Sequence, residues 1–293
     1  MARRNRYSLK DLQRDFPDDK TCVEYIFHAL HALDCDCGGE YRIMKDKERV
    51  LRKYQCSKCR AKISPTAHTI FHKSATPLTL WFHAIFVFAH AKSGISAKQM
   101  ERQLGVTYKC AYRILSQIRK ALKQSDKLLQ GIVETDAAFF GGVHKSGKDN
   151  KYLKQAIAAK TKVMIAVERN GEIRAKARPN VMADVQESFV RTHVAPHSFL
   201  FSDATRALNR VEGDYERHSV NHSKEEYVRG IVHTNTVDTW IAHVKRSIKG
   251  TFKSVSKEKL QEYLDAFVFH RNNRHSDKQR FVALLGMILQ PSR

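Results

Sequence analysis

Apolar residues recur at helical spacing in two stretches of the first 130 residues. In the first stretch, residues 8–33, Ser8 precedes an apolar face, as is typical of a helix N-cap. In the second stretch, residues 74–127, Thr76-Pro77 opens a long apolar run, and Ser96 and Thr107 stand before two further apolar faces. The pattern predicts a short helical start and, later, a region made of helices.

The later part of this region has the order helix, glycine-containing turn, basic helix. Ser96 starts the first of these helices, Leu104-Gly105 ends it, and Thr107 caps the second. This order is typical of a helix-turn-helix DNA-binding module, although an ordinary helical hairpin gives the same pattern. Residues of the second helix that could contact DNA are Lys109, Arg113, Arg119 and Lys120.

From residue 131 the pattern changes to short apolar runs bounded by polar residues. The runs at 131–136, 162–168, 173–177 and 198–203 predict strands, and Asn170-Gly171 predicts a hairpin between two of them. Helical spacing returns at 182–193, 238–248 and 257–271. Strands interleaved with helices predict an α/β fold with a mixed sheet.

Four of the six cysteines lie between the two helical stretches. They form two pairs about twenty residues apart, Cys35-Asp36-Cys37 and Cys56-Ser57-Lys58-Cys59. Paired cysteines at this separation predict a zinc ribbon that binds Zn²⁺ through four thiolates. The first pair is one residue short of the usual C-x-x-C, so Asp34 or Cys22 is an alternative ligand, and four free thiols are the alternative to a metal site.

The net charge points to a polyanionic partner. The 293 residues include 52 Lys and Arg against 30 Asp and Glu, which gives +22 at pH 7. The excess is spread over both halves of the chain, so it is not a single basic tail. Nucleic acid is the leading candidate partner of a protein this basic, and a solvated basic surface is the alternative.

No apolar run is long enough to cross a membrane, and the basic N-terminus is not followed by an apolar signal core. We therefore expect a cytoplasmic protein, associated with the nucleoid, that has no membrane partner. Cysteines in that compartment are more often thiols or metal ligands than disulfides.

Acidic residues end two of the predicted strands. Asp136 closes the run at 131–136, and Asp203 closes the run at 198–203. Two carboxylates at strand ends can hold Mg²⁺ or Mn²⁺, and two such ions about 4 Å apart support phosphodiester chemistry. Asn235 and Asp238, three residues apart on a helix, offer a third ligand, and Lys245 lies two turns beyond Asp238. Each aspartate alone could equally be a turn residue.

Several segments, in this order, resemble the ISXO-type insertion-sequence transposases. They are GIVETDAAFFGG, KTKVMIAVERNGEIRA, FLFSDA and the run from VNHSKEEYVRG through HTNTVDTWIAHVKRSIKG to FHRNNR. The earlier run from YQCSKCRAKISPTAH to YKCAYRIL is similar to the N-terminal part of the same family. The resemblance covers roughly residues 35–275.

The resemblance implies a ribonuclease H-like catalytic core of the DDE superfamily. By position, Asp136 and Asp203 correspond to the first two metal ligands, Asn235 to the family's Asn, and Lys245 to its Lys. Asp238 stands where the family often has Glu, so the third ligand is either Asn235 or Asp238. The C-x-C pair departs from the family's usual C-x-x-C.

These observations divide the chain into five predicted parts. They are an N-terminal helical segment (1–34), a zinc ribbon (35–63), a helix-turn-helix domain (74–127), a ribonuclease H-like catalytic domain (131–275) and a C-terminal tail (276–293).

The leading hypothesis is a transposase that binds terminal inverted repeats, cuts DNA with divalent metal ions and joins the 3′-OH ends to target DNA. Lys245 would hold a phosphate, and Arg246, Lys249 and Lys253 would extend the phosphate track. Because two ends must be joined, a homodimer or a larger assembly on DNA is expected. The alternatives are a catalytically inactive, transposase-derived regulator and another ribonuclease H-like nuclease, such as a resolvase.

Overall fold

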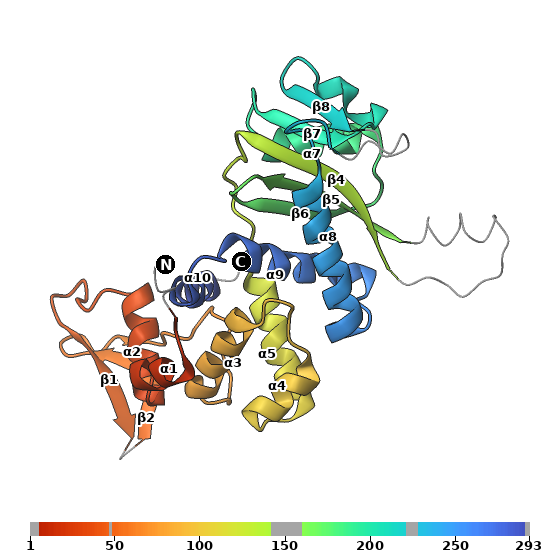
Figure 1. Ribbon diagram of the computed structural model, residues 1–293. Helices are drawn as coiled ribbons and strands as arrows, with labels where there is room; N and C mark the ends of the chain where they lie inside the picture. Colours follow the sequence, from red (N-terminus) through yellow and green to blue (C-terminus); the bar gives the residue numbers. More distant parts are fainter. Residues whose placement is uncertain (1–5, 47–48, 142–159, 221–227, 291–293) are drawn as a thin grey trace. The chain divides into compact units, whose positions relative to one another are not determined.

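The computed structural model describes residues 6–46, 49–141, 160–220 and 228–290 (Figure 1). The chain forms two compact units. One contains residues 1–123 together with 273–293, and the other contains residues 124–272.

The first unit begins with two capped helices and a small sheet. Ser8 caps α1 (Leu9–Asp15) with a reciprocal capping box, and Asp18 caps α2 (Asp19–Leu30). The sheet contains β1 (Tyr41–Asp46), β2 (Arg49–Cys56) and β3 (Lys62–Ile63), which pair antiparallel in that order. Phe27 of α2 stacks on Tyr54 of β2, with ring centroids 3.8 Å apart, so the sheet is attached to the helix by aromatic packing.

The rest of this unit is helical, as the periodicity predicts. It contains α3 (Leu78–His90), α4 (Ala97–Leu104), α5 (Tyr108–Ala121) and α10 (Asp277–Leu289). Helix α10 packs on α3, and its Arg280 is buried and donates to the backbone carbonyl of Ala89. The predicted division made residues 276–293 a tail. In the structure the apolar face of α10 completes the helical core of the first unit instead.

The second unit is built on a five-stranded mixed sheet. Its strands are β4 (Ile132–Phe140), β5 (Thr161–Glu168), β6 (Ile173–Arg178), β7 (Phe199–Asp203) and β8 (Glu216–Val220), in the order β6-β5-β4-β7-β8. Strands β4, β5 and β6 pair antiparallel, whereas β7 is parallel to β4 and β8 is parallel to β7. Asn170 has φ of +62° in the turn between β5 and β6, where an Asn-Gly hairpin is predicted.

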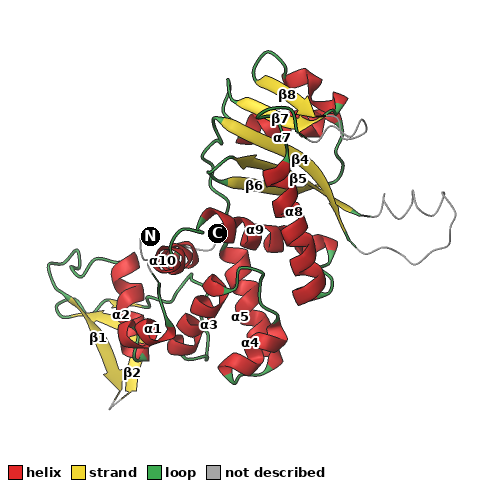
Figure 2. Cartoon of the chain, in the orientation of Figure 1, coloured by secondary structure: helices red, strands yellow, loops and turns green. Residues whose placement is uncertain are grey.

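Helices cover both faces of this sheet (Figure 2). On one face α8 (Asn235–Ser247) and α9 (Leu260–Asn272) pack on alternate residues of β4, β5 and β6. On the other face α7 (Ala183–His193) packs with the 3₁₀ turn Arg206–Val211. A π turn (Ile248–Phe252) and a 3₁₀ turn (Lys257–Lys259) connect α8 to α9. The unit is a mixed α/β domain, as predicted.

Two strands differ from the sequence pattern. Strand β4 does not end at Asp136 but continues to Phe140, because its second half pairs with β5 in a long hairpin. Strand β8 has no alternating apolar signal, since four of its five residues are polar, and it forms by pairing with β7. No helix in the described residues has the length and apolar character that spanning a membrane requires.

Candidate functional site

Two adjacent parallel strands bring Asp136 and Asp203 side by side. The parallel register of β4 and β7 pairs Thr135 with Ser202, so Asp136 and Asp203 follow directly on neighbouring strands. Strand β7 ends at Asp203, whereas β4 continues beyond Asp136. Asp136 therefore lies inside β4, level with the end of β7, and not at the end of its own strand as the sequence predicts.

The electrostatics of Asp136 identify its neighbours. The pKa of Asp136 is raised from 3.8 to about 6, chiefly by burial, and the negative charges of Asp203 and Asp238 contribute to the rise. The backbone N–H of Ala137, 2.7 Å from Oδ1, and the ammonium of Lys245 act in the opposite direction. Asp203, Asp238 and Lys245 thus lie near enough to Asp136 to act on its charge. We call these four residues together the carboxylate group.

Helix α8 supplies two members of this group. Asp238 lies in its first turn, and Lys245 lies seven residues later, which is two turns along the same face. The hydroxyl of Thr234 donates to Oδ2 of Asp238 at 2.9 Å. Asn235, at the start of the helix, is exposed, and its backbone carbonyl accepts from the Thr239 hydroxyl at 2.7 Å.

A buried carboxylate that the sequence analysis did not single out connects the strand to this helix. Glu134 of β4 is fully buried, and it lies two residues before Asp136, so both side chains are on the same face of the strand. Its Oε2 accepts from the backbone N–H groups of Thr236 and Val237 at 2.7 and 3.1 Å. Arg169 donates to Oε1 at 2.6 Å. A second acidic residue in this largely apolar strand, two positions before Asp136, was the available signal.

The three aspartates are not gathered as tightly as the ligands of one small cation. Among the described residues, the only group of three or more ligating side chains with all ligand atoms within 4.8 Å of one another is the cysteine cluster. Carboxylates that share two cations about 4 Å apart are spread more widely than those around one ion. The donor set, oxygen ligands near an ammonium, fits Mg²⁺ or Mn²⁺.

Lysines, Lys245 among them, line a cavity in the second unit. The cavity is about 650 Å³ and lies between the ends of β4 and β5 and the segment that follows α8. Lys245 belongs to both the carboxylate group and the cavity wall, and its Nζ lies 5.8 Å from the centre of the Phe140 ring. Arg246 is exposed on α8 but does not line this cavity. The lysines of the wall are Lys160, Lys245, Lys249, Lys253 and Lys257.

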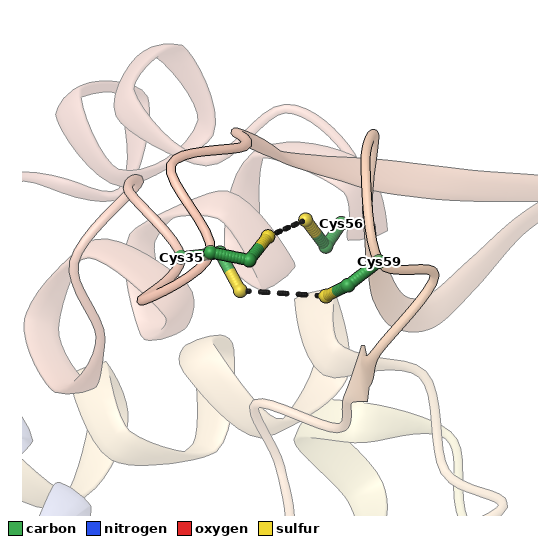
Figure 3. Close-up of side chains that lie close together, drawn as sticks. Cys35, Cys56 and Cys59 are labelled. Atoms are coloured by element: carbon green, nitrogen blue, oxygen red, sulfur yellow. Dashed lines mark hydrogen bonds between the residues drawn. The ribbon is translucent and has the colours of Figure 1, made fainter.

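The structure brings the four predicted cysteines of the first unit together (Figure 3). Their ligand atoms all lie within 4.8 Å, with 3.7 Å between the Sγ atoms of Cys35 and Cys59 and 3.4 Å between those of Cys37 and Cys56. Zn–S bonds of about 2.3 Å in a tetrahedron require S···S separations of about 3.8 Å. The donor set therefore fits a structural Zn²⁺, and neither Asp34 nor Cys22 belongs to the cluster.

The thiols of this cluster affect one another's pKa. Hydrogen bonds lower the pKa of Cys35, chiefly the one from the backbone N–H of Cys37. Burial raises the pKa of Cys56, but the backbone N–H groups of Cys59 and Lys58 outweigh it and bring the value to about 6. A backbone N–H lowers the pKa of Cys59, yet its three thiol neighbours raise it to about 12. Such a cluster gains from a cation that neutralises it.

Helices α4 and α5 have the predicted order, with Gly105 in the left-handed conformation between them (φ +65°). On α5, Lys109, Arg113 and Lys120 are exposed. Arg113 is also hydrogen-bonded to the hydroxyls of Ser74 and Thr76 and lies over the Trp81 ring. Arg119 is only 5% exposed, so its side chain does not lie on the surface that a DNA duplex would contact.

The comparisons with known proteins agree with this geometry. Residues 128–272 match the family described as ISXO2-like transposase domain. A protein of Halobacterium salinarum, described as an uncharacterized protein in transposable element ISH50, is 27% identical over an alignment of 256 residues that covers 80% of this chain and 83% of that protein. The family match shows that the second unit belongs to the ISXO2-like transposase domains, so the predicted resemblance is confirmed.

Two chains of solved structures have a weak likeness to this chain. A chain of the simian T-cell lymphotropic virus intasome in complex with a PP2A regulatory subunit is 10% identical, with a TM-score of 0.32, over 72% of this chain and 73% of that one. A chain of the Mos1 strand transfer complex is 12% identical, with a TM-score of 0.26, over 70% of this chain and 74% of that one.

Proposed function

We propose that this protein, whose residues 128–272 form an ISXO2-like transposase domain, is an active metal-dependent DNA transposase. It would bind the terminal inverted repeats of its element, cut the DNA and join the 3′-OH ends to target DNA. The observation that carries the proposal is the group formed by Asp136 and Asp203, on the adjacent strands β4 and β7, with Asp238 and Lys245 of α8.

The carboxylates of Asp136, Asp203 and Asp238 would hold the Mg²⁺ or Mn²⁺ ions. These ions, when bound, supply an activated oxygen nucleophile and stabilise the charge on the phosphate. We prefer Asp238 to Asn235 as the third ligand because the charge of Asp238 acts on Asp136, and because a carboxylate is the stronger ligand. The Thr234 hydroxyl would keep the Asp238 carboxylate in one orientation.

The lysines beside this group would hold the DNA backbone. Lys245 is near enough to Asp136 to lower its pKa, so it would contact the phosphate at the cleavage site. Lys249 and Lys253 would contact the next phosphates of the DNA backbone along the cavity. Lys160 and Lys257 add two positive charges to the same wall. Arg246 would contact phosphate outside the cavity. Lysine contacts of this kind bind any sequence and weaken as salt rises.

The first unit would recognise the DNA ends. The four cysteines would bind Zn²⁺ and thereby fold the small sheet, which has little core of its own. Helix α5 would enter the major groove as the second helix of a helix-turn-helix, with Lys109, Arg113 and Lys120 as its basic contacts. We omit Arg119 from this set because it is buried. Two copies of the chain would be needed to join two ends.

The test is cleavage of a labelled DNA duplex that carries the end of the element encoding the chain. Wild type and Asp203→Ala are compared with Mg²⁺ and with a chelator. The proposal predicts Mg²⁺-dependent 3′-OH ends from wild type alone. Asp214→Ala, which removes an exposed carboxylate paired with Arg191, is the matched control and should cleave like wild type.

Two results would contradict the proposal. If wild type binds the end DNA but never cuts it, the chain is a transposase-derived regulator without catalytic activity. If Asp203→Ala cuts as well as wild type, the carboxylate group is not the catalytic centre.

A further inference from the structure

The N-cap residue of helix α8 does not cap it, although this helix carries Asp238 and Lys245. Thr234 occupies the N-cap position and is 2% exposed, but its side chain makes no hydrogen bond to the backbone of the first turn. Its hydroxyl donates to Oδ2 of Asp238 instead. The first backbone N–H groups of a helix need partners, and N-cap hydroxyls are their usual source. In α8 the N-cap hydroxyl of Thr234 instead holds the side chain of Asp238.

Glu134 supplies the missing cap from the neighbouring strand. Two of the N–H groups in the first turn of α8, those of Thr236 and Val237, donate to its Oε2. The Thr236 hydroxyl donates to Oε1 at 2.9 Å. A carboxylate at this position also interacts favourably with the positive end of the helix dipole. Because the capping side chain comes from β4, the cap ties the helix to the strand that carries Asp136.

Arg169 holds the Glu134 carboxylate in the orientation that caps α8. Its Nε donates to Oε1 of Glu134, and its other nitrogens donate to the backbone carbonyls of Ile231 and His233 at 2.8 and 3.1 Å. The guanidinium also lies 4.9 Å from the centre of the Phe201 ring, on β7. Arg169 therefore holds together the strand, the segment before α8 and the strand that ends in Asp203.

We propose that Glu134 is a positioning residue, which fixes helix α8 to strand β4 so that Asp238 and Lys245 keep their place beside Asp136. The inference rests on the proposed function for the metal-binding role of the aspartates. It adds that Glu134 sets the position of Asp238 relative to Asp136. Glu134 lies two residues from Asp136 on the same face of the strand, so its contact with α8 and the metal-binding carboxylate share one rigid support. Groups that orient metal ligands typically contribute 10- to 100-fold in metal affinity or activity.

The test compares Glu134→Gln with Asp265→Asn. Glutamine has the same shape, but it loses the charge and turns N–H donors toward the donors of α8. Asp265 is also an acid in the interior of this unit, and it accepts from Gln124 and Gln261 at 2.6 and 2.8 Å, away from α8. We expect Glu134→Gln to raise the Mg²⁺ concentration for half-maximal cleavage about tenfold or more, and Asp265→Asn to leave it unchanged.

A second readout does not depend on cleavage. Mn²⁺ binding to the full chain, measured by titration, should weaken about tenfold in Glu134→Gln and stay at the wild-type level in Asp265→Asn. A double-mutant cycle with Asp238→Asn adds a sharper requirement. If Glu134 acts through Asp238, its substitution should cost little further affinity once Asp238 is changed, whereas independent contributions would add.

The outcomes separate this inference from the proposed function. If wild type cleaves DNA and Glu134→Gln has the wild-type Mg²⁺ dependence while only its melting temperature falls, Glu134 is merely structural and the inference is wrong. If wild type fails to cleave but binds Mn²⁺ in a Glu134-dependent manner, the proposed function fails and the inference stands. Should Glu134→Gln not fold, Thr236→Val removes one hydrogen bond to Glu134 and should raise the same Mg²⁺ requirement severalfold.

Discussion

Replacing Asp136 by Asn should destroy cleavage and at the same time stabilise the metal-free protein. The pKa of Asp136 is raised from 3.8 to about 6, first by burial and then by the charges of Asp203 and Asp238. The folded protein therefore holds this proton more tightly than the unfolded chain does. Since each pH unit corresponds to about 1.4 kcal/mol, the ionised side chain costs about 3 kcal/mol of folding free energy at pH 7. Asparagine has the same shape and no charge to bury.

The sign of the effect fixes its pH dependence. Above pH 6 Asp136 is ionised in both states, so the full cost is present and the variant should be up to about 3 kcal/mol more stable. As the pH falls from 6 to 3.8, wild type takes up the proton in the folded state first, and the difference should shrink. Near pH 4 the two proteins should unfold at almost the same denaturant concentration.

The assay is urea unfolding in the presence of a chelator, followed by tryptophan fluorescence. The chain has two tryptophans, so a common Trp81→Phe background leaves Trp240, which is buried on α8, to report on the second unit. Asp214→Asn is the control, because an exposed carboxylate contributes within about 0.5 kcal/mol. Equal stability of Asp136→Asn and wild type at pH 7, or a gain that grows as the pH falls, would refute the reasoning.

Three further predictions concern the metal sites and the lysine cavity. Gly39→Ala should release Zn²⁺ to a chelator more readily than wild type, because a Cβ at this position would lie 2.7 Å from Sγ of Cys56. Gly286→Ala, which has open space around the added Cβ, is the control and should retain Zn²⁺ like wild type. Equal zinc contents of the two variants, measured by atomic absorption, would contradict this prediction. Thr234→Val should raise the Mg²⁺ requirement for cleavage severalfold because Asp238 loses its hydrogen bond, with circular dichroism confirming an unchanged helix content. Lys249→Ala should weaken DNA binding equally for specific and random duplexes and should reduce the salt dependence by about one ion, as measured by fluorescence anisotropy.

Local sequence patterns predicted many of the helices and strands correctly. Ser8, Ser96 and Thr107 cap the helices that their positions predict, because a hydroxyl at an N-cap satisfies the backbone a few residues away. Asn170-Gly171 forms the predicted hairpin for the same local reason. Strand β8 and the role of α10 were not predictable in this way. A mostly polar strand forms only because β7 offers it hydrogen bonds, and α10 packs on a helix almost two hundred residues earlier in the chain.

For the candidate site, too, the sequence supplied one kind of information and the tertiary structure another. Residue type, spacing and a family resemblance were enough to propose which residues carry the chemistry, namely the four cysteines, Asp136, Asp203 and Lys245. Tertiary structure decided how they are arranged. The parallel register of β4 and β7 sets Asp136 beside Asp203, and burial among like charges gives Asp136 its raised pKa.

Only the tertiary structure showed Glu134 joining strand to helix. Its partners, Thr236 and Val237, lie about one hundred residues along the chain, so no local pattern records the contact. Residue identity fixes what a side chain can donate, accept or ligate, and that information is local. Distance, burial and electrostatic coupling depend on segments far apart in sequence, and these exist only once the sheet and α8 have packed together.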